Sequence, residues 1–197
     1  MMKITLAVLA LGVGAASACA EDATHLRGTI EATDRATVTI KRHAGGTVTV
    51  AIPDETRIFA ATDGKLSDVK PESYIGAAAI PQPDGTQQAL QVTVFASALR
   101  GTADGHYPWD LAAGSTLTNG AVGTLTGTSG RTVKVQYKGG EKTVVVPEDV
   151  PVTQVDPGDK SLLVAGARVV AIIRPESGGK REAAFLVVGR NGVVPSM

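Results

Sequence analysis

Two segments of the 197-residue chain carry the same succession of alternating apolar and polar residues, about 95 residues apart. The first segment contains Thr37-Val38-Thr39-Ile40, and the second contains Thr132-Val133-Lys134-Val135. Side chains that alternate with a period of two point to opposite faces of a β-strand, one buried and one wet. The pattern therefore predicts an internal duplication of a small unit built from strands.

The expected fold class follows from how the unpaired edges of such a sheet can be covered. No stretch longer than about one turn shows a helical period. Each unit has five short alternating runs, with hairpin signals at the Gly pairs 45–46 and 139–140. Closure into a barrel removes the exposed edges of a lone sheet. We therefore expect an all-β protein with two tandem five-stranded barrels, residues 26–98 and 120–190, joined by an ordered linker over residues 99–119.

A family resemblance rests on turn and linker motifs. Three strands, the turn Leu66-Ser67-Asp68-Val69-Lys70-Pro71 and a hairpin are similar to small secreted bacterial domains of an uncharacterised OB-like (oligonucleotide/oligosaccharide-binding-like) family. The strings GHYPWDL (105–111) and GSTLTNG (114–120) resemble the linkers of tandem members. Residues 121–189 keep the strands but have Val164-Ala165-Gly166 in place of the turn motif. The resemblance implies OB-like barrels and an address in the bacterial envelope, and no established activity.

Residues 1–20 have the three parts of a secretory signal peptide. Lys3 precedes an apolar run and then small residues. The run is shorter than the ~20 residues that span a bilayer, and we expect no transmembrane segment. Cleavage after Ala18-Cys19-Ala20 would release a periplasmic or secreted chain. Alternatively, Ala16-Ser17-Ala18-Cys19 resembles a lipobox, which would make a membrane-anchored lipoprotein through lipidation of Cys19.

Composition and motifs argue against several functional classes. The 19 basic and 19 acidic residues balance, and the strands lack the aromatic and basic stripe that single-strand nucleic-acid binders need. A single Cys excludes a disulfide framework and a Cys-rich metal cage. Zinc-protease, phosphate-loop and serine-hydrolase motifs are absent from the mature sequence. We therefore expect no nucleic-acid partner and no enzyme activity.

Residues 104–110 of the linker combine acidic, imidazole and aromatic side chains. Asp104, His106 and Asp110 offer nitrogen and oxygen ligands to a divalent metal such as Zn²⁺, Ni²⁺ or Cu²⁺. The alternative is that Tyr107 and Trp109, the only Trp, pack the linker into a groove between the barrels. This groove is then the expected ligand pocket.

Taken together, the sequence predicts an exported, non-enzymatic envelope protein, a binding or assembly module whose partner is an envelope protein or a small ligand. The alternative prediction is a periplasmic protein that binds a divalent metal through His106.

Overall fold

The computed structural model describes residues 25–127, 131–174 and 180–196, and this part of the chain is all-β, as predicted. Its ordered segments are thirteen strands and short 3₁₀ turns. No helix in the described ranges is long and apolar enough to cross a membrane. The strands are β1 (His25–Thr33), β2 (Thr37–Arg42), β3 (Thr47–Ala51), β4 (Arg57–Asp63), β5 (Tyr74–Pro81), β6 (Gln87–Phe95), β7 (Gly105–Pro108), β8 (Thr116–Thr126), β9 (Thr132–Tyr137), β10 (Gly140–Val145), β11 (Val152–Pro157), β12 (Arg168–Ile173) and β13 (Ala183–Gly189).

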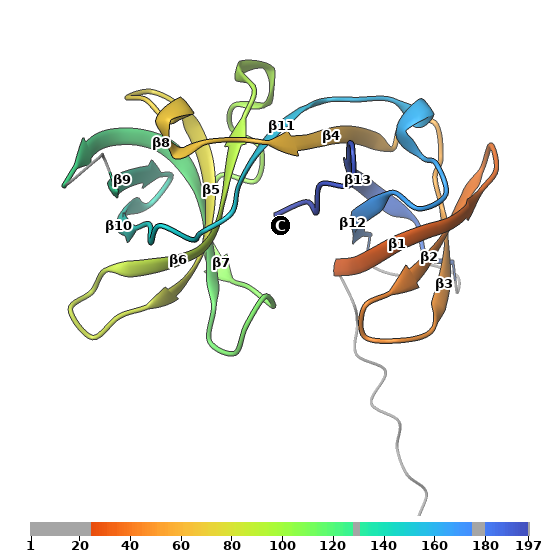
Figure 1. Cartoon of the computed structure of the whole chain (residues 1–197), viewed down its shortest axis with the longest axis horizontal. Helices are drawn as coiled ribbons and strands as arrows, with labels where there is room; N and C mark the ends of the chain where they lie inside the picture. The colour runs from red at the N-terminus through yellow and green to blue at the C-terminus, as the bar shows by residue number, and fades with distance from the viewer. Residues whose placement is uncertain (1–24, 128–130, 175–179, 197) are drawn as a thin grey trace, which may run out of the picture.

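Two small barrels lie side by side (Figure 1). Barrel 2 consists of β8, β9, β10, β6 and β5 in that order, and it closes because β5 pairs with β8. Its β10–β6 pairing is parallel and the others are antiparallel. Barrel 1 has the equivalent order β1, β2, β3, β13 and β12, and β12 pairs with β1. A single parallel bridge, between Ala51 of β3 and Glu182 just before β13, connects the remaining edges. One closed five-stranded barrel is therefore present, and the strands of barrel 1 follow the same order.

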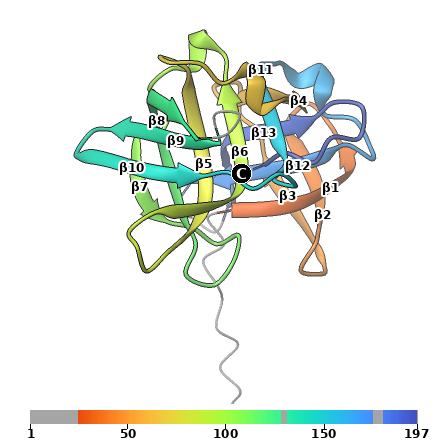
Figure 2. The same ribbon diagram turned by 60° about the vertical axis from the view of Figure 1, so that its left-hand side comes forward.

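The barrels differ from the expectation in which residues build them. Residues 26–98 and 120–190 were expected to form one barrel each, but the β5–β6 hairpin completes barrel 2 and the β12–β13 hairpin completes barrel 1. The two repeats thus exchange their last hairpins within one chain. Figures 1 and 2 show β4 and β11 running between the barrels, where they pair with each other antiparallel.

The exchange requires a close crossing of the chain at the ends of β4 and β11. Each strand continues straight into the neighbouring barrel, so the hairpin that follows is delivered there. The crossing is close: a Cβ on Gly64 would lie 3.1 Å from the backbone carbon of Thr153, and one on Gly158 would lie 3.1 Å from the backbone nitrogen of Ala60. Glycine permits this approach because it has no Cβ.

Three hydrophobic clusters hold the molecule together. The barrel interiors are aliphatic, with members such as Ile40 in barrel 1 and Val135 in barrel 2 that are fully buried. Burying one such side chain contributes about 1.5–3 kcal/mol. The third cluster lies between the barrels and is aromatic, with Phe59, Tyr74 and Phe95 buried in it. The junction is therefore a packed interface that both barrels share.

Candidate functional site

The linker strand β7 positions the side chains at the junction. Residues 105–108 pair antiparallel with β8, with His106 opposite Thr118. After β7, the backbone N–H of Trp109 donates to the backbone carbonyl of Ser115 (2.8 Å). The Ser115 hydroxyl donates in return to the backbone carbonyl of Trp109 (2.9 Å). These bonds fix the loop that follows and hold the Trp109 ring at the gap between the barrels.

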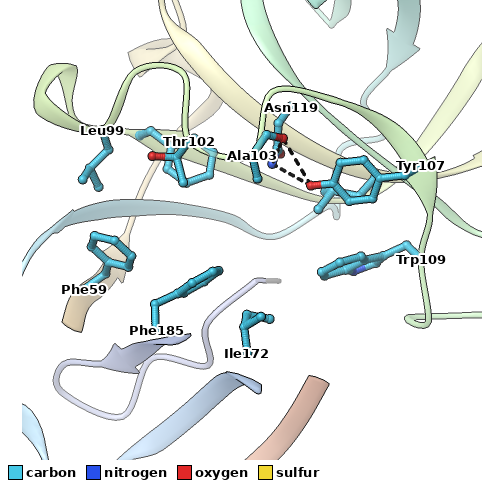
Figure 3. A pocket seen from close by; sticks show the side chains of 11 residues that line it. Phe59, Leu99, Thr102, Ala103, Tyr107, Trp109, Asn119, Ile172 and Phe185 are labelled. Atoms are coloured by element: carbon cyan, nitrogen blue, oxygen red, sulfur yellow. Dashed lines mark hydrogen bonds between the residues drawn. The ribbon is translucent and has the colours of Figure 1, made fainter. Parts of the chain in front are cut away.

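A small cavity of about 30 Å³ lies under this linker. Figure 3 shows Phe59, Phe185 and Ile172 on one side of it, and the linker residues Tyr107 and Trp109 on the other. Its remaining lining residues are Phe95, Leu99, Thr102, Ala103, Leu117 and Asn119. The walls are thus mainly apolar and aromatic, and they come from both barrels and the linker.

The cavity lining also holds polar atoms without partners. The Asn119 amide nitrogen donates to the carbonyl of Ala103 and to the Tyr107 hydroxyl, both at 3.1 Å (Figure 3). Among the described residues, the Asn119 Oδ1 and the Trp109 Nε1 are buried and have no hydrogen-bond partner. A buried polar atom without a partner costs about 1–3 kcal/mol. One unused acceptor and one unused donor therefore lie on residues that line an aromatic cavity.

Charged groups surround the outer face of Trp109. The His25 ring lies 4.3 Å from the Trp109 ring, centroid to centroid, and the Arg27 guanidinium lies 5.5 Å from the same ring centroid. Arg27 also donates two hydrogen bonds of 2.8 Å to the Asp110 carboxylate. Burial acts to raise the pKa of Asp110, but these hydrogen bonds and the positive charge outweigh it and hold that pKa below its usual value.

The structure corrects the predicted metal site. Asp104 accepts hydrogen bonds from the Tyr74 hydroxyl (3.2 Å) and the Lys138 N–H (2.6 Å), while Asp110 pairs with Arg27. His106 is bonded through Nδ1 to the Thr118 hydroxyl (2.8 Å) and stacks on Tyr137. The described ranges contain no group of three or more His, Cys, Asp or Glu side chains that could hold a metal ion. The three candidate ligands are separated because each is bound to a different neighbour.

The two linker aromatics that the sequence predicts to pack in a groove both line the cavity at the junction. Tyr107 and Trp109 are in edge-to-face contact there, with ring centroids 6.1 Å apart. Sequence reasoning did not place Phe59, Phe95 or Phe185 at the junction, yet all three line the cavity. The available signal was the unbroken apolar run of residues 58–61, because a strand that is apolar on both faces lies between two layers. Cys19 and residues 1–20 lie outside the described residues.

Comparison of the chain with family models, with curated proteins and with solved structures finds no match. The chemistry of the junction must therefore be argued from its own geometry. That geometry offers an apolar, aromatic surface, which suits binding of a mainly apolar group.

Proposed function

We propose that this chain is an exported, non-enzymatic envelope protein that binds a ligand or partner protein at the junction of its two barrels. The observation that carries the proposal is the aromatic cavity under the linker, to which both barrels contribute. Aromatic walls with a few polar groups are typical of binding sites.

The size and polarity of the cavity restrict what it would take. Its volume of about 30 Å³ is roughly twice what one ordered water needs. A methyl-sized group fits such a space as it stands, a larger aliphatic or aromatic group would fit only if the linker moved aside, and a large cofactor does not fit. These features favour an apolar side chain of an envelope protein, or a small ligand of the same chemistry, over nucleic acid.

Export is the second part of the proposal, and it rests on the sequence. Residues 1–20 would direct the chain to the envelope, in keeping with the resemblance to secreted OB-like domains. The mature protein is then either released with Glu21 first or anchored through lipidated Cys19. The intact mass of the protein purified from an exporting host distinguishes these forms, and a mass that retains residues 1–20 would contradict export.

Neutral small molecules test the cavity directly. Trp109 is the only Trp, so its fluorescence reports on the junction without a label. Benzyl alcohol and cyclohexanol are expected to shift the Trp109 emission in a saturable way and to raise the unfolding midpoint, because a ligand that binds the native state stabilises it.

Two variants make this test specific. Leu99→Phe adds bulk at the cavity lining and is expected to abolish the saturable shift, whereas Val164→Phe adds even more bulk at an exposed position (56%) and should leave it intact. Absence of saturation in the unaltered chain, or equal saturation in both variants, would refute the proposal.

A further inference from the structure

A second, larger pocket opens between the barrels and has a different chemistry. Its volume is about 140 Å³, roughly ten times what one ordered water needs. Arg27, His43 and Arg168 line it from barrel 1, and Gln91 lines it from β6 of barrel 2. The rest of its wall is mainly apolar and comes from Gly28, Leu111, Val169, Val170, Val194 and Pro195.

Arg168 provides a positive charge that no described carboxylate neutralises. Its Nη1 donates to the Thr29 hydroxyl (3.2 Å) and to His43 Nε2 (3.0 Å). None of the ion pairs in the described ranges includes Arg168. Arg27 contributes a second guanidinium, but Asp110 balances its charge. The pocket therefore has a net charge near +1.

Gln91 lines the same pocket, and its side chain carries an unused acceptor. Its Oε1 is buried and has no hydrogen-bond partner among the described residues. A rotation of the side-chain amide would bring this oxygen to an occupant of the pocket, where only a donor would satisfy it. The pocket thus presents a guanidinium and, on another strand, an amide that can supply an acceptor.

We propose that this pocket binds a small monocarboxylate that carries a hydroxyl or amide N–H next to its carboxyl group. The carboxylate would accept hydrogen bonds from Arg168, because a guanidinium matches the two carboxylate oxygens in geometry and charge. The neighbouring O–H or N–H would donate to Gln91 Oε1. One negative charge balances the pocket, whereas a dianion such as phosphate would leave excess charge beside Asp110. This inference goes beyond the proposed function, because it concerns a second pocket. The residues that line this pocket differ from those of the aromatic cavity, although one of them, Arg27, also lies against the Trp109 ring.

Four probes separate the parts of this recognition. Lactate has the carboxylate and the hydroxyl, propionate lacks the hydroxyl, lactamide lacks the charge, and inorganic phosphate is the competing anion. Affinities come from nuclear magnetic resonance titrations that follow the Arg168 Nε–H and the Gln91 side-chain amide. Lactate is expected to bind tightest, propionate several-fold more weakly, and lactamide and phosphate at least tenfold more weakly.

Variants of the pocket complete the test. Arg168→Gln should weaken lactate binding about tenfold or more, and Gln91→Leu should reduce the affinity for lactate to that for propionate. The matched control is Arg35→Gln, at an exposed position between β1 and β2, which should change nothing. Equal affinities for lactate and lactamide, tighter binding of phosphate, or undiminished lactate binding by Arg168→Gln would overturn the proposal. Because Leu99→Phe blocks only the aromatic cavity, lactate binding by that variant distinguishes failure at one site from failure at the other.

Discussion

Gly28 shows how one residue lets two strands approach. It lies on β1 opposite Arg42 of β2, and a Cβ at this position would overlap the carbonyl oxygen of Lys41. Backbone atoms cannot move aside cheaply. We expect Gly28→Ala to lower the free energy of unfolding by about 2–3 kcal/mol, the cost typical of overpacking, as measured by urea denaturation.

A glycine on β8, in the second repeat, supplies the control. A Cβ on Gly123 would meet only the side-chain amide of Gln136, at 3.0 Å. That amide can rotate away, so Gly123→Ala should change stability by less than about 0.5 kcal/mol. Equal losses from both substitutions would show that the close approach at Gly28 is not the cause.

The two histidines of the junction make stability depend on pH. Burial lowers the pKa of His25 below its usual 6.5, although Asp110 opposes the shift, and burial also lowers the pKa of His106, with Lys142 adding to the effect. A lowered pKa means that the unfolded chain binds protons first. Stability should therefore fall as the pH drops below about 6.5. Urea unfolding at pH 7.5 and pH 5.5 checks this, and His25→Gln should lose less stability over that interval than the unaltered chain. An equal or larger loss in His25→Gln would contradict the assignment.

The Trp109 ring holds the linker against β1 of barrel 1. Trp109 contacts His25, Arg27 and Tyr107 but is only partly buried. We expect Trp109→Ala to lower the free energy of unfolding by about 2 kcal/mol, less than the ~3–5 kcal/mol of a fully buried aromatic. Circular dichroism measures the change without relying on Trp fluorescence. Trp109→Phe, which keeps a ring at the junction, should lose less than half as much. No loss in Trp109→Ala would mean that the linker is held by β7 alone.

Alternation along the chain predicted strands such as β2 and β9, because each of these has one buried and one wet face. The runs at Thr37–Arg42 and Thr132–Tyr137 both show it in the structure. Pairing partners could not be predicted in the same way. Nothing in the local pattern of β4 tells whether the chain turns back after Gly64 or crosses to the other barrel, since the strand itself is the same in both cases. The exchange of hairpins was therefore missed.

The same limit explains which site residues could be predicted. Tyr107 and Trp109 are neighbours in sequence and were assigned to the junction correctly. Phe59 and Phe185 reach the same cavity from β4 and β13, which pair only in the folded chain. The structure does not bring the three predicted metal ligands together, because residues that are close in sequence need not direct their side chains to one point. Asp110 instead pairs with Arg27, 83 residues away.

For the whole molecule, the exchange makes each half of the chain incomplete. Barrel 1 needs β12 and β13 from the second repeat, and barrel 2 needs β5 and β6 from the first. The junction cavity exists only when both are assembled, because its walls come from β4, β6, β12 and β13 together with the linker. Binding at the junction would thus be coupled to the folding of the entire described chain rather than of one barrel.

This dependence predicts the behaviour of the first repeat by itself. A segment of residues 25–99 holds β1 to β4 and the β5–β6 hairpin, so each copy has an unfilled barrel and a hairpin suited to it. Because β4 directs the hairpin away from its own barrel, we expect two copies to exchange hairpins and form a dimer, as measured by light scattering after gel filtration. The segment 25–64, which lacks the hairpin, should remain unfolded. A folded monomer of 25–99 would contradict the prediction, because it would show that the hairpin can turn back onto its own strands.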